Sequence, residues 1–243
     1  MATFTGLSII IPTVDETKAI AETLDIISDI CRPEDITEIL VIHSKDSAQE
    51  HLGALRALAV QYGDYHVRVL CQPGRGLGDA LFYGCDISRG SHFFMIGADR
   101  ENDTYALRDM LVLAKQHPDT VITSSRTLTK DGLREYPVSK RFLVRAFGIC
   151  ARIFFGSRQT DITYAYQITP KSVFDPTFFA ADHKAFVLEL ALMADIRKIP
   201  VIEIPTRIAR RKEGVSHSGF GYYAGFAETA VNMFIKRKVG RGR

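Results

Sequence analysis

Apolar and polar positions follow two alternating rhythms along the first half of the chain. Short, mostly apolar runs predict strands, whereas apolar residues at helical spacing, such as Ile20, Leu24 and Ile27, predict helices between them. The strands are expected at residues 7–12, 38–42, 67–70, 93–96 and 120–123. The helices are expected at residues 15–30, 47–62 and 104–116, with one more between a glycine-rich turn and about residue 87. Apolar strands that alternate with helices predict a mostly parallel α/β sheet, covered on both faces, whose ligands bind where the strands' carboxyl ends meet.

The rhythm changes after about residue 126. A polar stretch at 127–139 precedes a basic and aromatic helical segment at about 140–156. Beyond it, the pattern predicts a strand, a helix, a strand and a last helix, at residues 162–168, 184–198, 201–208 and about 222–238. We find no repeat, low-complexity linker or strong boundary, so the expectation is a single domain over residues 1–243.

The charge balance narrows the classes of protein. The 243 residues carry a formal net charge of +3, and this near-neutral balance argues against a general nucleic-acid binder. Positive charge gathers in residues 236–243, which hold five cations and no anion. A tail of this kind suits either a solvated chain end or an anionic membrane surface.

Targeting and redox signals point to the cytoplasm. The N-terminus lacks the basic and long apolar regions of a signal peptide, and no apolar run is long enough to span a bilayer. Any membrane contact is therefore expected to be peripheral. The cysteines form neither a CxxC pair nor a dense disulfide framework, which favours a reducing cytosol. They are Cys31, Cys71, Cys85 and Cys150.

A cluster of carboxylates directly follows the apolar run at 93–96. Asp99 and Glu101 alternate along the chain and can point to the same side. Hard oxygen ligands at the end of a central strand suit Mg²⁺ or Mn²⁺ holding a diphosphate. The other interpretation is that an acidic residue caps the helix that starts near Thr104. The sequence favours the cap for Asp103 and the metal for Asp99, which lies at the strand end.

A glycine-rich turn, CQPGRGLGDA, occupies residues 71–80. It departs from the GxGxxG fingerprint because Asp79 stands in place of the third glycine, so a dinucleotide site is disfavoured. Glycines before a helix N-terminus still make a natural phosphate cradle, with Arg75 as a counter-charge. A tight turn between strand and helix fits the pattern equally well.

The helical segment at about 140–156 combines arginines with aromatic and branched apolar residues. Arg141, Arg145 and Arg152 fall on one helical stripe. Apolar side chains fill much of the remaining surface: Phe142, Phe147, Ile149, Ile153 and Phe154. This pattern fits a helix in a membrane interface whose arginines meet lipid phosphates, and it also fits a core helix with a polar rim.

Six segments, in order, resemble the pattern of family 2 glycosyltransferases over residues 7–219. IIIPTVDE resembles IIPxYNE, and GRGLGDALFYG resembles GKGxGxAxxxG. MIGADRE falls where the family carries its DxD metal motif, often MDADLQ, and TSSR resembles the GSR that follows. TDITYAYQITPKSVF resembles DxTSGFRxxxxxxL, and IPVIEIPTRIARRKEGVSHSG resembles the family's RxxGxSKxG ending. The closest branch looks like dolichyl-phosphate mannose synthase and the bacterial polyprenyl-phosphate glycosyltransferases.

This resemblance implies a GT-A, Rossmann-like fold and an inverting transfer from a UDP- or GDP-linked sugar, with Mg²⁺ or Mn²⁺ on the diphosphate. Residues 1–126 would bind the nucleotide sugar, 127–221 the acceptor, and 222–243 would form a C-terminal helix and basic tail. The implied nucleotide-sugar site comprises Pro12, Thr13, Glu16, His43, Arg75, Gly76, Ala98, Asp99, Ser216 and His217. The implied metal ligands are Asp99 and Glu101, and the implied catalytic residues are Asp99, Arg126 and Arg211.

Three departures from the family pattern bear on activity. Gly97 replaces the first aspartate of DxD, His43 and Ser44 replace the aspartates of the family's VDD, and Val14-Asp15 replace Tyr-Asn. Lost carboxylates imply weaker metal binding, a different nucleotide or a non-catalytic copy that still binds a nucleotide. A working transferase is favoured because many other family positions persist, and Glu101 offers the cation a better ligand than the family's glutamine.

The acceptor implied by this branch is a polyprenyl phosphate, at the cytoplasmic face of a membrane. The residues placed to meet its phosphate are Arg126, Arg141, Arg145 and Asp161. A phosphate needs no general base, whereas the alternative, a hydroxyl of a glycan or other molecule, does. Asp161 and Glu189 are the candidate bases; otherwise they are a turn residue at a strand start and a residue on an exposed helix face. A homo-oligomer is left open.

Overall fold

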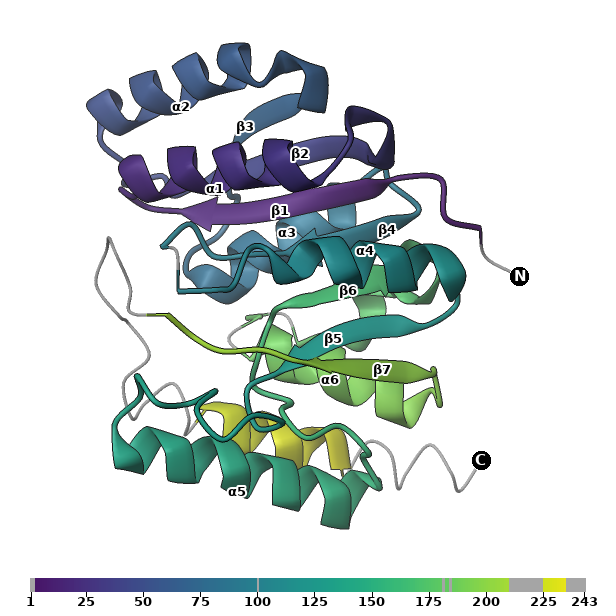
Figure 1. The fold of residues 1–243 in the computed structure, drawn as a ribbon. Helices are drawn as coiled ribbons and strands as arrows, with labels where there is room; N and C mark the ends of the chain where they lie inside the picture. Colours follow the sequence, from purple (N-terminus) through teal and green to yellow (C-terminus); the bar gives the residue numbers. More distant parts are fainter. Residues whose placement is uncertain (1–2, 100, 181, 184, 210–224, 235–243) are drawn as a thin grey trace.

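The computed structural model describes residues 3–99, 101–180, 182–183, 185–209 and 225–234. A seven-stranded sheet in the order β3-β2-β1-β4-β6-β5-β7 runs through this part of the chain (Figure 1). Neighbouring strands are parallel, except that β6 is antiparallel to both β4 and β5. The strands are β1 (Leu7–Thr13), β2 (Ile36–His43), β3 (Val67–Cys71), β4 (His92–Met95), β5 (Val121–Ser125), β6 (Gln167–Pro170) and β7 (Val201–Pro205).

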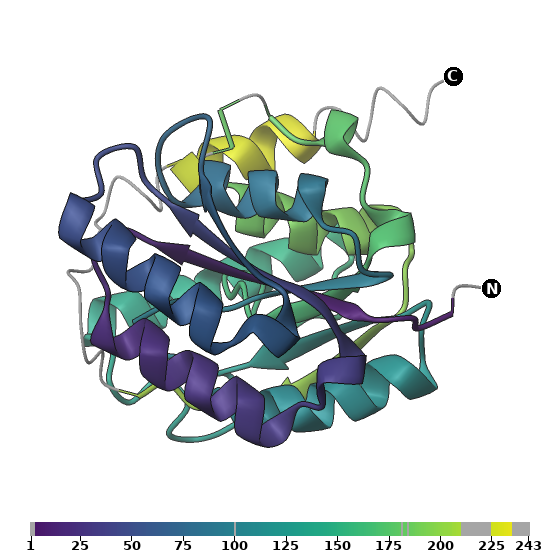
Figure 2. The same cartoon turned by 90° about the horizontal axis from the view of Figure 1, so that it is seen from above.

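Helices cover both faces of the sheet (Figure 2). They are α1 (Lys18–Ile30), α2 (Gln49–Gln61), α3 (Leu77–Ile87), α4 (Ala106–Gln116), α5 (Val138–Phe155) and α6 (Phe186–Ile196). Because side chains alternate across a strand, Ile9 and Ile11 of β1 pack in a core with α1, α2 and α4, whereas Ile10 packs in a second core with α3 and α6. The long apolar runs of the sequence therefore reflect strands that are buried on both sides.

A third apolar cluster lies beyond β7. Helix α5 packs against α6 and against a helical segment at residues 225–234, through Ala151, Phe155, Leu188 and Phe226 (Figure 1). The residues that α5 buries, Val144, Gly148, Ala151 and Phe155, recur at helical spacing and form one face. The opposite face of the same helix is exposed to solvent.

The predicted mostly parallel α/β sheet with helices on both faces is confirmed. The strand predicted at 162–168 is wrong in its start, because β6 begins only at Gln167, and its antiparallel direction was not predicted. Asp103 was expected to cap a helix near Thr104, but α4 begins at Ala106 and none of the described side chains caps it. Within the described ranges, no helix is long and apolar enough to cross a membrane.

Candidate active site

One edge of the sheet gathers most of the residues predicted to act. Strands β1, β2, β4 and β5 run in the same direction, so Thr13, His43, Asp99 and Arg126, which end or follow them, share that edge. Strand β6 runs the other way, and its amino end therefore lies at this edge. As a result, the turn at 160–166 is placed beside the end of β5. Because β6 is antiparallel, the turn before it lies at this edge of the sheet. A parallel strand in the same position would have placed that turn at the opposite edge.

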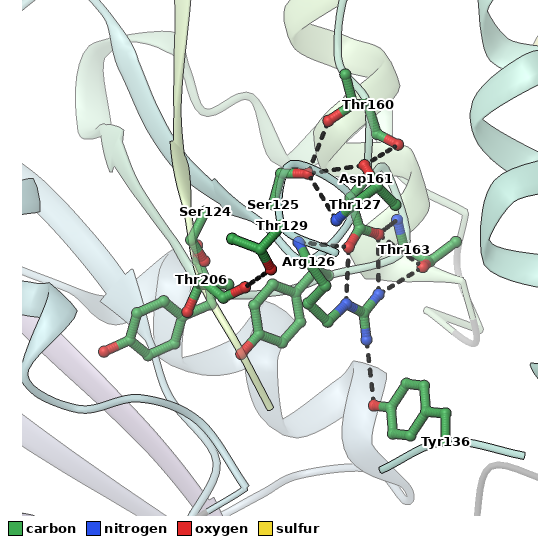
Figure 3. Close-up of polar contacts among 12 residues, drawn as sticks. Ser124, Ser125, Arg126, Thr127, Thr129, Tyr136, Thr160, Asp161, Thr163 and Thr206 are labelled. Atoms are coloured by element: carbon green, nitrogen blue, oxygen red, sulfur yellow. Dashed lines mark hydrogen bonds and ion pairs between the residues drawn. The ribbon is translucent and has the colours of Figure 1, made fainter. Parts of the chain in front are cut away.

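Arg126 is buried in a dense set of polar contacts (Figure 3). Its Nε donates to Asp161 Oδ2 at 2.7 Å, and its Nη2 donates to Asp161 Oδ1 at 2.8 Å, so the pair is bidentate. Nη2 also donates to Thr163 Oγ1 at 2.8 Å, and Nη1 donates to the Tyr136 hydroxyl at 3.1 Å. The guanidinium carbon lies 4.2 Å from the ring centre of Tyr164. Four of the five guanidinium N–H groups are therefore used within the protein.

The ion pair changes the roles open to Asp161. Burial by itself would raise the pKa of this carboxyl group, but the charge and hydrogen bonds of Arg126 outweigh burial and lower the pKa. Burial would likewise lower the pKa of Arg126, and Asp161 raises it instead. An ionised carboxylate bound by two guanidinium nitrogens is a poor proton acceptor, so the hypothesis that Asp161 is a base is disfavoured. Arg126 retains at most one N–H for a phosphate oxygen.

Tyr136 links this pair to the carboxylate cluster. Its hydroxyl donates to Glu101 Oε1 at 2.6 Å while it accepts from Arg126. Burial, the largest effect, and the Glu101 carboxylate raise the pKa of Tyr136 despite the opposing charge of Arg126. The segment that follows β7 also reaches this point, since the backbone N–H of Ala209 donates to the carbonyl of Glu101 at 2.9 Å.

Asp99 lies in a tight turn after β4, where its Oδ1 accepts from the backbone N–H of Glu101 at 3.0 Å. Gly97 lies close to two side chains of the same turn, so a larger residue here would require them to shift. A Cβ at Gly97 would lie 3.1 Å from Asp99 Oδ1 and 3.2 Å from Asn102 Oδ1. Asn102 fills this place: it accepts from the N–H of Gly97 at 3.1 Å and donates to the Tyr164 hydroxyl at 2.7 Å. The departure at Gly97 is thus integrated into the packing of the turn.

The donor set at this turn fits a divalent cation that a diphosphate helps to hold. Asp99 and Glu101 offer hard carboxylate oxygens, the ligands that Mg²⁺ and Mn²⁺ prefer. Among the described residues, no group of three or more His, Cys, Asp and Glu side chains is placed to hold a metal. Magnesium sites in phosphate-transfer enzymes commonly use only one or two protein carboxylates, and phosphate oxygens and water complete them.

At the end of β1, several hydrogen bonds hold the carboxylate of Glu16. Its Oε2 accepts from Thr13 Oγ1 at 3.0 Å and from the backbone N–H of Val14 at 2.9 Å. Burial would raise the pKa of Glu16, but these hydrogen bonds outweigh burial and lower the pKa. The ring of His51 on α2 extends this network: its Nε2 lies 3.3 Å from Thr13 Oγ1, and its Nδ1 lies 3.1 Å from Thr17 Oγ1. Glu16 is thus a fixed, ionised acceptor at this edge.

The glycine-rich turn has a tighter structure than a simple cradle. Gly76 has a φ of +88° and immediately precedes α3, and a Cβ at Gly74 would overlap the carboxylate of Asp79. The positive φ of Gly76 favours glycine, whereas a larger residue at Gly74 would require the Asp79 side chain to move. Arg75 is exposed, as a counter-charge should be. Gln72 Oε1 and Asp79 Oδ2 are buried, and neither has a hydrogen-bond partner in the part of the chain that is described.

The remaining predicted residues lie at the strand ends, on α5, on α6 or outside the described ranges. At the strand ends, Pro12 is half-buried and Ala98 is buried, and His43 Nδ1 lies 2.8 Å from the carbonyl oxygen of Ser44. Arg141 is tied to the carbonyls of Tyr136 and Arg134 at 2.7 and 2.6 Å, whereas Arg145 is exposed. Glu189 was expected on an exposed helix face, but it is buried on α6, where its Oε1 accepts from the N–H of Ala180 at 3.0 Å. Residues that lie outside the described ranges are Arg211, Ser216 and His217.

Several residues of this edge escaped the sequence analysis. They are His51, Asn102, Tyr136, Thr163 and Tyr164. Tyr136 stands in a polar stretch that carries no periodic signal, and Asn102 looks like one more polar residue of a loop. Thr163 and Tyr164 lie inside the segment that was assigned to a strand. Only contacts between distant parts of the chain reveal their places.

Comparison with known proteins agrees with this architecture. The profile of glycosyl transferase family 2 matches residues 8–188, which is more than half of the chain. Among solved structures, glucosyl-3-phosphoglycerate synthase from Mycobacterium tuberculosis in complex with UDP has a TM-score of 0.64 at 16% identity, with 96% of this chain and 80% of that chain covered. Its complex with Mn²⁺, UDP and glucosyl-3-phosphoglycerate has a TM-score of 0.63 at 15% identity, with the same coverage.

A third structure of that synthase, with Mg²⁺ and UDP, gives a TM-score of 0.60 at 17% identity and covers 86% of this chain and 73% of that chain. At these identities, the similarity establishes the GT-A fold alone, because a shared fold does not imply a shared function. The family profile rests on the sequence itself and spans the strand ends described above. The chain belongs to glycosyl transferase family 2.

Proposed function

We propose that this glycosyltransferase moves a sugar from a UDP- or GDP-linked donor to a polyprenyl phosphate at the cytoplasmic face of a membrane, with inversion at the sugar carbon. Asp99 and Glu101 would hold Mg²⁺ or Mn²⁺, which neutralises charge on the departing nucleoside diphosphate. Similar structures contain Mn²⁺ or Mg²⁺ together with UDP, which supports this assignment. Thr13, Glu16 and the glycine-rich turn would bind the nucleotide.

The exposed face of α5 is the observation that supports a lipid acceptor. Its members recur at helical spacing on the side opposite the buried face: Val138, Phe142, Arg145, Ile149, Arg152 and Ile153. Phe142, Ile149 and Ile153 have exposed fractions of 70%, 60% and 69%. The helix contains no acidic residue. An apolar stripe set among cations fits an anionic lipid surface, into which the apolar side chains insert while arginines meet phosphates.

A second copy of the chain is a poorer occupant of this face. A symmetric dimer through α5 would bring the same cations toward one another, without acidic partners on the helix. Helix α5 also starts two residues after Tyr136, which contacts Arg126 and Glu101 at the proposed site. A lipid phosphate delivered along this helix would therefore arrive close to the carboxylate turn.

The chemistry at Arg126 also favours a phosphate acceptor. A hydroxyl acceptor needs a base, and one of the two candidates, Asp161, is held as an ionised partner of Arg126. The oxygen of a phosphate is already anionic near neutral pH and attacks without proton removal. The proposed phosphate acceptor therefore needs no general base from the protein.

Vesicle flotation tests the membrane part of this proposal. We expect the protein to float with vesicles that contain phosphatidylglycerol and less with phosphatidylcholine alone. The double variant Phe142→Gln/Ile149→Gln should lose flotation, because it removes two of the inserting side chains. Val60→Gln is the matched control, since Val60 is an exposed apolar residue on α2, at the other end of the sheet.

Sugar transfer tests the acceptor directly. Purified protein with Mn²⁺ is given UDP- and GDP-linked sugars and either a short-chain polyprenyl phosphate or soluble glycerate and glycan acceptors. Product on the polyprenyl phosphate, with release of the nucleoside diphosphate, is the expected result. Transfer to a soluble hydroxyl with none to the lipid phosphate would overturn the proposed acceptor. Nucleotide binding without any turnover would indicate a non-catalytic homologue.

A further inference from the structure

The Tyr136 hydroxyl occupies a position with only one consistent hydrogen-bond direction. It lies 3.1 Å from Arg126 Nη1 and 2.6 Å from Glu101 Oε1. A guanidinium can only donate, so the hydroxyl must accept from Arg126 and give its own proton to Glu101. One phenol therefore fixes the direction of the Glu101 carboxylate and is itself oriented by the buried ion pair of Arg126 and Asp161.

The same residue is fastened to the start of α5. Tyr136 precedes Pro137, which occupies the N-cap position of α5, and the backbone N–H of Tyr136 donates to the carbonyl of Leu133 at 3.0 Å. Arg141, in the first turn of α5, donates to the carbonyl of Tyr136 at 2.7 Å. The ammonium group of Lys140 lies 3.8 Å from the centre of the Tyr136 ring. The first turn of α5 and the Tyr136 side chain therefore form one packed unit.

We propose that Tyr136 is a positioning residue that aims the Glu101 carboxylate at the catalytic cation and couples the placement of α5 to cation affinity. This inference rests on the proposed function, in which Asp99 and Glu101 hold the metal. A ligand carboxylate with one oxygen held by a hydrogen bond presents its other oxygen in a defined direction. Loss of such an outer partner typically lowers metal affinity about 10- to 100-fold. Asp99 has a local support of its own in the turn, whereas the support of Glu101 comes from a distant loop.

The coupling runs between two surfaces with different tasks. Glu101 is a proposed ligand of the cation that holds the donor, and α5 carries the face that is proposed to meet the lipid. Displacement of the first turn of α5 would shift the Tyr136 hydroxyl away from Glu101, because Arg141 and Lys140 hold both ends of that residue. Seating α5 correctly would thus favour a fully assembled cation site.

The test measures Mn²⁺ binding in the presence of UDP or GDP, from the electron paramagnetic resonance signal of free Mn²⁺, with the full chain and without turnover. Tyr136→Phe keeps the ring and removes the hydroxyl, and we expect a loss of Mn²⁺ affinity of about tenfold or more. Nucleotide binding without metal should not change. Tyr65→Phe is the matched control, because it removes another tyrosine hydroxyl with two hydrogen-bond partners. These partners are the carbonyls of Ser28 and Cys31, far from the site.

The link to α5 has its own variant. Arg141→Gln breaks the bonds to the carbonyls of Tyr136 and Arg134 but leaves Tyr136 in place, and we expect a severalfold loss of Mn²⁺ affinity. Arg158→Gln, at an exposed arginine just beyond α5, should have no effect. Mn²⁺ affinity that is unchanged in Arg141→Gln overturns the coupling, and affinity unchanged in Tyr136→Phe overturns the positioning role. If the wild-type protein binds no Mn²⁺ with either nucleotide, the proposed function itself fails.

Discussion

Replacing Asp161 by Asn tests whether the buried ion pair stabilises the fold or serves as a reactive acid–base pair. The side chains of Arg126 and Asp161 are 4% and 0% exposed, and two bonds of 2.7 and 2.8 Å join them. Asn keeps the shape but places an NH₂ group against a guanidinium that can only donate. Removing one partner of a buried pair leaves an uncompensated charge, which costs about 3–5 kcal/mol. Since a domain of this size is stable by only about 5–15 kcal/mol, the loss is large.

Urea unfolding followed by circular dichroism measures this cost. We expect a lower midpoint with an unchanged dependence on urea, because the same surface unfolds. The pH dependence has a defined sign. The folded-state pKa of Asp161 is depressed below its ordinary value of 3.8, so the pair contributes fully above that pH and its contribution disappears as the pH falls toward the folded-state pKa. The wild-type protein should therefore lose more stability between about pH 5 and pH 2 than Asp161→Asn does.

A double-mutant cycle separates the pair from its surroundings. Arg126→Met/Asp161→Leu replaces both charges by apolar side chains and should recover most of the stability that either single variant loses. A cost below about 1 kcal/mol for Asp161→Asn, the range of an exposed ion pair, would refute the reasoning. A normal stability with abolished transfer would instead identify Asp161 as a reactive residue.

Two glycines give further predictions. Gly97→Ala brings a Cβ within 3.1 Å of Asp99 Oδ1, so it should weaken Mn²⁺ binding in calorimetry and cost about 1 kcal/mol of stability; an unchanged Mn²⁺ affinity would contradict the assignment of Asp99 to the metal. Gly74→Ala should displace Asp79 and reduce nucleotide affinity, measured by fluorescence of a labelled nucleotide, whereas Gly63→Ala, with no atom within 4 Å of its Cβ, should change nothing. Equal nucleotide affinity in both of these variants would exclude the glycine-rich turn from the donor site.

The helices and strands of residues 1–126 were predictable because their signals are local. Strands β1, β2 and β4 are mostly apolar runs buried on both faces, and each is followed along the chain by a helix with its own period. Direction follows from the repeated alternation of strand and helix, so the position of Asp99 at the ligand edge was also predictable. Its turn is set by near neighbours along the chain, as the bond to the N–H of Glu101 shows.

The contacts made by residues beyond 126 depend on topology and were not predictable. Strand β6 has only four residues, too few to show a period, and its direction decides which edge receives the turn before it. Arg126 meets Asp161, and Tyr136 meets Glu101, across 35 residues in each case. The expected cap at Asp103 failed because the first turn after the carboxylates is not helical. Propensity identifies residues that favour caps and turns, but only packing decides which of them do so.

The buried pair also determines how charge is distributed at this edge. Arg126 and Asp161 neutralise one another, so the pair as a whole exerts little attraction on an incoming phosphate. In the proposed function, charge on a leaving diphosphate would then be met mainly by the cation proposed at Asp99 and Glu101 and by cations outside the pair. What Arg126 supplies is position: it orients Tyr136, which in turn orients Glu101. If Glu101 holds the cation as proposed, Arg126 contributes to that site through its hydrogen bond to Tyr136, and Asp161 keeps Arg126 in place.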